Sequence, residues 1–162
     1  MNLGKQIRLF NAIEVHEALA STLVELLKQT CEAVKASISF VIANMIQSQY
    51  NQQRKDELIE CMVNTFALGN GFVHRKTFIT FCSQAIQVLS FKQFRKYFLE
   101  SYLGLTNDPI DQVKVHFLKS VLASRPYIQQ DVDLMIRFNN LLTQLRLSEI
   151  DSVAIAAERL DI

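Results

Sequence analysis

Several features common in globular proteins are scarce or missing in this sequence. Tryptophan is absent, and the 162 residues include only four glycines and two prolines. Because glycine and proline mark most turns, their scarcity favours long helices and disfavours a fold of many short strands. An excess of charge is also missing, since 17 basic residues face 16 acidic ones. We therefore expect no bulk electrostatic attraction to nucleic acid or to an anionic membrane.

Membrane segments and cysteine pairs are missing as well. The longest apolar run, Ile38–Ile46, is interrupted by Asn44 and is far shorter than the ~20 residues of a membrane span. The first ten residues lack the apolar core of a signal peptide. Cys31, Cys61 and Cys82 are an odd number without a CxxC pair, which argues against disulfides and zinc and for buried thiols in a reducing compartment. We predict a cytoplasmic protein without membrane or metal, with the nucleus as the alternative compartment.

Helical periodicity covers most of the chain. Apolar residues recur at intervals of three and four, and Pro109 suits the first turn of the sixth predicted helix. Asp131 or Asp133 could cap the seventh helix. The pattern predicts eight helices, at about 14–28, 34–45, 56–68, 73–89, 94–105, 109–124, 133–145 and 148–162.

The apolar pattern repeats about every forty residues. Val34, His74, Val113 and Val153 are separated by 40, 39 and 40 residues. Positions at fixed offsets from them are apolar in every unit except for Ser120. These further sets are Leu19, Ile59, Phe98 and Phe138; Leu23, Val63, Tyr102 and Leu142; Leu26, Phe66, Leu105 and Leu145; Ile38, Phe78, Phe117 and Ala157; and Val41, Phe81, Ser120 and Leu160. We expect all of them in a shared core, with His74 as a hydrogen-bonded structural imidazole.

A repeat of about forty residues built from two helices is typical of the HEAT/armadillo class. We therefore predict an all-α fold: an α-solenoid of about four HEAT-like antiparallel helix hairpins in two layers. The whole chain forms a single array, with repeats at 13–50, 52–90, 91–125 and 131–162, and residues 1–12 form a capping segment or the remnant of a preceding repeat.

The turns between paired helices carry a more specific resemblance. Asp108-Pro109 followed by Val113-Lys114 matches the usual HEAT turn, whereas the fourth unit has Ala154 where a basic residue is expected. The stretches Gly69–Ser90 and Tyr97–Val121 are similar to the last repeats of the scaffold subunit of protein phosphatase type 2A and to related regulatory subunits of phosphatase 4. The resemblance implies a non-catalytic scaffold whose turns receive a Ser/Thr phosphatase catalytic subunit.

Catalytic motifs are not found in the sequence. The turn at Leu68–Gly71 lacks the Gly-Lys-Ser/Thr of a phosphate-binding loop. The three histidines, His16, His74 and His116, have no nucleophile or metal-ligand spacing around them. We predict that the protein is not an enzyme and uses no cofactor, no metal and no small-molecule substrate.

In a stacked array the side chains at core positions pack against one another. We therefore expect binding at the turns and on one exposed helix layer. Phe72 and Ile110 are apolar residues in turns and are candidate anchors for a partner. Lys35, Arg75 and Lys114 recur beside the turns, where they contact a partner, pair with an acidic residue of a neighbouring turn such as Asp111, or do both. The predicted partner-binding residues are Asn70, Gly71, Phe72, Arg75, Pro109, Ile110, Asp111, Lys114, Glu149 and Ile150.

Three functional hypotheses follow. The first is a scaffold or regulatory subunit that binds a Ser/Thr phosphatase catalytic subunit through these turns. The alternative is a HEAT-repeat interaction segment of an unrelated transport or cytoskeletal assembly, which would use the second-helix layer or the ends of the array. A nucleic-acid-binding repeat is disfavoured by the neutral charge balance. The mixed run at 91–98 does not restore it, because Phe91, Phe94 and Phe98 share an inward helix face and leave Lys92, Arg95 and Lys96 in solvent.

Overall fold

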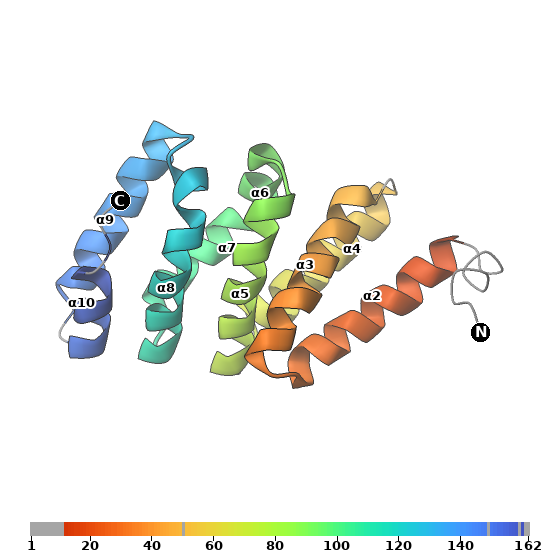
Figure 1. Ribbon diagram of the computed structural model, residues 1–162, viewed down its shortest axis with the longest axis horizontal. Coiled ribbons are helices and arrows are strands. Elements are labelled where there is room, and N and C mark those ends of the chain that lie inside the picture. Colours follow the sequence, from red (N-terminus) through yellow and green to blue (C-terminus); the bar gives the residue numbers. More distant parts are fainter. Residues whose placement is uncertain (1–11, 50, 149, 159, 161–162) are drawn as a thin grey trace.

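The computed structural model describes residues 12–49, 51–148, 150–158 and 160, and at positions 12–17, 123 and 151 it describes only the backbone. These residues form helices without strands. The helices pair into four antiparallel hairpins that follow one another along a solenoid (Figure 1). The predicted all-α solenoid is thereby confirmed. The division into repeats with the boundaries given above stays a prediction.

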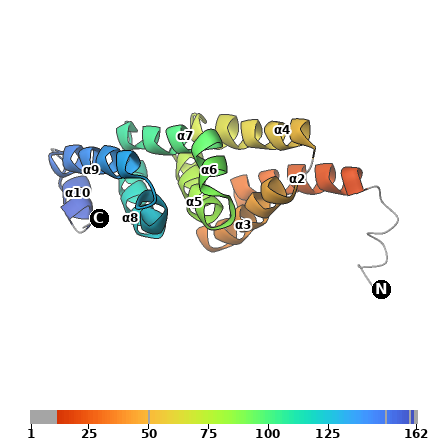
Figure 2. The same ribbon diagram turned by 90° about the horizontal axis from the view of Figure 1, so that it is seen from above.

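The first helices of the hairpins, with their extensions, are α2 (Ala12–Gln29), α4 (Gln52–Met62) with η2 (Val63–Ala67), α6 (Phe91–Tyr97) with α7 (Leu99–Gly104) and η3 (Leu105–Asn107), and α9 (Val132–Arg146). The second helices are α3 (Glu32–Ser48), α5 (Phe72–Val88), α8 (Asp111–Ile128) and α10 (Asp151–Glu158). Each second helix packs on the next, α3 on α5, α5 on α8 and α8 on α10. Seen from above, α4, α7 and α9 form the other layer, and α2 lies nearer to α3 than this row does (Figure 2).

Aromatic rings join the second, third and fourth hairpins through the core. Phe81 of α5 lies edge-on to Phe98, with 5.1 Å between ring centroids. Phe117 of α8 contacts Tyr102 of its own hairpin at 4.7 Å and Phe138 of α9 at 5.9 Å. These rings are almost completely buried. Aromatic pairs at these distances add to the free energy gained from burying their area, so the three hairpins share one continuous core.

The residues predicted to lie in the core are buried or half-buried in these three hairpins, but most of those in the first hairpin are exposed. Ile38 is buried as expected, but Leu19, Leu26, Val34 and Val41 are exposed. In α2, the side chains that face the core are Val24 and Leu27, one residue further along than predicted. One residue corresponds to a rotation of about 100° around a helix axis. The first hairpin therefore presents a different face of its first helix to the array.

Two local predictions also need correction. Helix α8 was expected to end near Ser124, but it continues through Pro126 to Ile128. A proline removes the hydrogen bond to the carbonyl four residues earlier, here that of Leu122, and Leu122 lies at the exposed surface, where water can replace the lost donor. Among the cysteines, Cys82 is buried, which raises the pKa of its thiol, whereas Cys31 is exposed just before α3.

Candidate protein-binding groove

The turn between the second hairpin's helices has a tightly constrained backbone. Residues 63–67 form a π-helical turn, which the amide N–H of Leu68 closes by donating to the carbonyl of Val63 at 3.0 Å. A Cβ atom at Gly69 would lie 2.2 Å from the carbonyl oxygen of Thr65, so only glycine fits at this point. The chain then enters α5 at Phe72, and the ring of His74 lies edge-on to Phe66. This turn leaves Leu68 and Phe72 at the surface.

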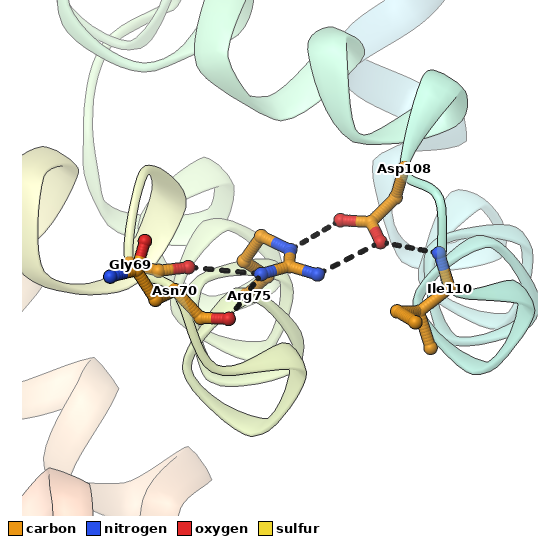
Figure 3. A network of polar contacts seen from close by, with 5 residues as sticks. All are labelled: Gly69, Asn70, Arg75, Asp108 and Ile110. Carbon is orange, nitrogen blue, oxygen red and sulfur yellow. Dashed lines mark hydrogen bonds and ion pairs between the residues drawn. The ribbon is translucent and has the colours of Figure 1, made fainter.

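Arg75 connects this turn to the Asp-Pro turn of the next hairpin (Figure 3). Its guanidinium donates to both carboxylate oxygens of Asp108, from Nε at 2.5 Å and from Nη2 at 3.1 Å. Its Nη1 donates to the carbonyls of Gly69 at 2.9 Å and Asn70 at 3.2 Å. Asp108 Oδ1 also accepts a hydrogen bond from the backbone N–H of Ile110 at 2.8 Å. One side chain thus fixes the backbone of both turns.

The Arg75–Asp108 pair is largely shielded from water. The exposed fraction of the side chain is 14% for Arg75 and 2% for Asp108. Hydrogen bonding to the Asp108 carboxylate raises the pKa of the Arg75 guanidinium. A bidentate pair of this kind holds both partners in a fixed geometry. The pair therefore acts as a rigid and internally neutral link between two adjacent turns.

A groove of about 670 Å³ lies between the two turns. Three apolar side chains on its walls remain exposed, Leu68 by 69%, Phe72 by 39% and Ile110 by 40%. Apolar side chains that protrude beside a polar, fixed backbone are typical of protein interaction sites. The lining residues are Ala67, Leu68, Gly69, Asn70, Gly71, Phe72, Arg75, Gly104, Asn107, Asp108, Pro109 and Ile110.

The structure brings together six of the ten residues predicted to bind a partner. Asn70, Gly71, Phe72, Arg75, Pro109 and Ile110 all line the groove. Asp111 and Lys114 lie next to it, on the first turns of α8, and Ile150 is half-buried at the separate turn before α10. Glu149 and residues 1–11 are outside the described part of the chain.

The three basic residues beside the turns pair within the protein. Arg75 bonds to Asp108, whereas Lys35 and Lys114 pair with residues of their own helices, Glu32 at 3.1 Å and Asp111 at 3.4 Å. Only Arg75 therefore pairs with a neighbouring turn as the intramolecular alternative predicts, and contact of these basic residues with a partner stays a prediction. For Arg75 the partner in the neighbouring turn is Asp108 rather than Asp111.

Six lining residues were not among the predicted site residues, namely Ala67, Leu68, Gly69, Gly104, Asn107 and Asp108. For Leu68 a signal existed, because an apolar residue directly before a Gly-Asn-Gly turn resembles Phe72 and Ile110 in kind. For Asp108 the sequence showed only its place in the Asp-Pro turn. Its pairing with Arg75 could not be predicted, because the two residues are 33 positions apart.

Metal sites and membrane-spanning helices are both absent from the described part of the chain. No group of three or more histidine, cysteine or acidic side chains there could hold a metal ion. Within the same residues, no helix has the length and apolar character needed to cross a membrane.

Comparison with known proteins gives one curated relative at a distance. The chain is 27% identical over 112 residues to the mouse protein "Serine/threonine-protein phosphatase 4 regulatory subunit 4". The match covers 67% of this chain and 13% of the relative, so the chain spans a small part of that protein's length. No family model matches the sequence, and no solved structure does either. The relative is named as a regulatory rather than a catalytic subunit, which is consistent with a regulatory or scaffold role.

Proposed function

We propose that this chain is a non-catalytic scaffold or regulatory segment that binds the catalytic subunit of a Ser/Thr protein phosphatase through the groove between its second and third hairpins. The observation that carries the proposal is the exposure of Leu68, Phe72 and Ile110 on turns held rigid by Arg75 and Asp108. The distant similarity to a phosphatase 4 regulatory subunit supports this choice of partner.

The groove suits a protein partner for a physical reason. Its two charged residues neutralise each other, so it offers neither a free cation for a phosphate nor a free carboxylate for a cation. What remains accessible is apolar area on a preorganised backbone. Binding would release water from that area without a cost for ordering the turns, which is how a small set of anchors dominates the affinity of an interface.

The test is a binding measurement on purified proteins. The chain is immobilised and titrated with the catalytic subunit of phosphatase 4, and the double variant Phe72→Ala/Ile110→Ala is titrated in parallel. We expect the variant to lose at least tenfold in affinity, since truncation of buried anchors commonly costs 2 kcal/mol or more each. Its helicity and melting temperature should stay close to those of the unmodified chain, because both side chains are already exposed.

A matched control separates the groove from the rest of the surface. Leu122 of α8 and Ile136 of α9 are exposed apolar residues outside the groove. The double variant Leu122→Ala/Ile136→Ala should keep its affinity for the catalytic subunit. Equal losses in both double variants, or no binding by the unmodified chain, would contradict the proposal.

The alternative of an unrelated assembly also has an observation in its favour. Phe40 of α3 and Leu122 of α8 are exposed apolar residues on the second-helix layer. A partner that docks on this layer would be lost with Phe40→Ala/Leu122→Ala and retained with the groove variant. The two double variants therefore discriminate between the two functions.

A further inference from the structure

The two layers of the solenoid differ in how their charges are balanced. Helices α3, α5 and α8, which lie side by side in the second-helix layer (Figures 1 and 2), contain no aspartate or glutamate beyond their first residue. In the first-helix layer, α4, α7 and α9 carry carboxylates in addition to cations, at Asp56, Glu57, Glu60, Glu100 and Asp133. The three second helices therefore have an excess of basic side chains, which are Lys35, Arg75, Lys76, Lys114, Lys119 and Arg125.

Half of these cations are neutralised within the protein. The ion pairs described above engage Lys35, Arg75 and Lys114. Lys76, Lys119 and Arg125 form no ion pair with any side chain that the structure describes. Lys76 is half-buried and Lys119 is exposed. Their positive charges are therefore available to a binding partner.

Lys76 and Lys119 come together around His116, where α5 and α8 are in contact. The Nε2 atom of His116 lies 3.0 Å from the hydroxyl oxygen of Thr80, and this hydroxyl donates to the carbonyl of Lys76 at 3.3 Å. Lys119 follows His116 by three residues, so the two side chains are neighbours on the surface of α8. Burial lowers the pKa of the His116 imidazole, and the charges of Lys76 and Lys119 both add to this shift. Two ammonium groups thus act on one neutral ring.

The size and surroundings of this cluster favour a protein over a nucleic acid as its ligand. Nucleic acids gain affinity by placing many phosphates in a row against basic side chains, and this cluster offers only two lysines. Leu122 follows Lys119 by three residues on α8 and is 60% exposed. A peptide can place a carboxylate near each lysine and an apolar side chain on this leucine, whereas a phosphate backbone has nothing to pair with it.

We propose that the surface formed by Lys76, His116, Lys119 and Leu122 binds an acidic segment of a protein partner, with its carboxylates beside the two lysines. Complementary charge gives such a contact its specificity and a fast association. No internal ion pair has to be broken, because neither lysine is engaged within the described part of the chain. None of the four residues lines the groove between the turns, so the inference does not depend on the proposed function.

The first test is a titration with a peptide. A fluorescently labelled peptide of consecutive glutamates with one central leucine is titrated with the 162-residue chain at low salt, and its anisotropy is measured. We expect saturable binding that weakens as salt is added, because salt screens exposed charges. The same peptide with glutamine in place of glutamate should not bind. The groove variant Phe72→Ala/Ile110→Ala keeps both lysines and should bind the peptide like the unmodified chain.

A single-stranded oligonucleotide with the same charge as the peptide tests the other class of ligand. It should bind more weakly than the glutamate peptide. Tighter binding of the oligonucleotide would assign the surface to nucleic acid, and absence of peptide binding would leave the surface without its expected ligand. Either result would overturn the proposal.

A pair of matched variants locates the contact. Lys76→Gln/Lys119→Gln removes both ammonium groups and should weaken peptide binding by about fivefold or more. Lys55→Gln/Lys92→Gln removes the same charge from the first-helix layer, where Lys55 is half-buried and Lys92 is exposed. This control should change the affinity by less than about twofold. Equal losses in the two variants would mean that the peptide responds only to net charge, which would overturn the proposal.

The ring of His116 provides a second readout, by nuclear magnetic resonance. A carboxylate bound beside the ring should raise the pKa of His116 and move its resonances, which His116→Gln identifies by their absence. The protein's own charges around the ring are the same with and without the peptide, namely Lys76, Lys119, Lys35 and Glu32. The ring of His74 packs edge-on against Phe66, and its resonances should stay in place. Changes at His74 without changes at His116 would place the peptide elsewhere and overturn the proposal.

Discussion

The first hairpin and the three that follow share the same apolar spacing but pack differently. In the later hairpins the predicted apolar stripe of each first helix faces the core, and rings such as Phe98, Tyr102 and Phe138 bridge to neighbouring helices. In α2, two adjacent stripes are apolar, and the array buries only one of them. A period in the sequence therefore locates the helices of a repeat. The covering neighbour decides which face of each helix is inside.

Polar contacts differ between the two regions in the same way. Ion pairs cross from the second hairpin to the third at Arg75–Asp108, and from the third to the fourth at Arg95–Asp131 and Glu100–Arg137. Among the described side chains of the first hairpin, Glu25–Lys28 and Glu32–Lys35 are ion pairs within one helix. A hollow of about 310 Å³ also separates α2 from α4, with Val24, Leu58 and Cys61 among its walls. We therefore expect substitutions in the later hairpins to have the larger effects on stability.

The largest expected effect is that of Phe117→Ala in the tightly packed region. The ring is completely buried between Tyr102 and Phe138, so its removal leaves a cavity that neither neighbour can fill. We expect a loss of about 3–5 kcal/mol in the free energy of unfolding. Urea denaturation followed by circular dichroism measures it. A loss well below 1 kcal/mol would mean that α8 does not present this face to the core.

A matched pair of neighbouring leucines tests the rotation of α2 directly. Leu27 is fully buried and Leu26 is 44% exposed. Leu27→Ala should cost about 2–4 kcal/mol in the free energy of unfolding, whereas Leu26→Ala should cost less than about 1 kcal/mol. The same urea experiment serves for both. If Leu26→Ala proved the more costly, the first hairpin would follow the same register as the others, and the comparison would fail.

Breaking the Arg75–Asp108 pair between the turns should lower the free energy of unfolding by as much as Leu27→Ala does, or by less. Arg75→Met leaves the buried carboxylate of Asp108 without its cation, which we expect to cost about 3 kcal/mol in unfolding free energy. Lys114→Met removes a same-helix pair near the surface and should cost less than about 0.5 kcal/mol.

A double variant shows whether the unpaired carboxylate of Asp108 causes the loss of stability in Arg75→Met. Adding Asp108→Asn to Arg75→Met removes the buried charge but keeps an acceptor for the backbone N–H of Ile110. We expect it to recover part of the lost stability. If the double variant were less stable than Arg75→Met alone, the penalty would come from lost packing of the arginine side chain instead.

These expectations also show what the sequence could and could not predict. The helices, their pairing and the exposure of Phe72 and Ile110 followed from periodicity and from apolar residues placed in turns. The buried face of α2 could not be predicted in this way, because Leu19, Leu23 and Leu26 satisfy helical spacing as well as Ala20, Val24 and Leu27 do. Periodicity gives the width of an apolar arc but not the neighbour that covers it. The ion pair between Arg75 and Asp108 could not be predicted for the same reason, because only the stacking of the hairpins brings their turns together.

The smallest predicted effect is a pH dependence of the free energy of unfolding that arises in the layer of second helices. His116 of α8 lies beside Thr80 of α5, with 3.0 Å between its Nε2 and the threonine hydroxyl. Burial lowers the pKa of this imidazole below its ordinary value, and the positive charge of Lys76 adds to the shift. Lys119 and Lys35 act in the same direction, while Glu32 opposes them.

The direction of the pH effect follows from proton linkage. Since the folded-state pKa is the lower one, the unfolded chain takes up the proton first as the pH falls through the ordinary histidine value near 6.5. The free energy of unfolding should therefore decrease below that pH until the folded imidazole is protonated as well. In His116→Gln, where an amide can keep the bond to Thr80, the decrease between pH 7 and pH 5.5 should be shallower. Urea denaturation at a series of pH values measures both slopes, and equal slopes would show that the contact between α5 and α8 tolerates the charged imidazole. In that case the packing of these two helices would be looser than that of the aromatic core beneath them.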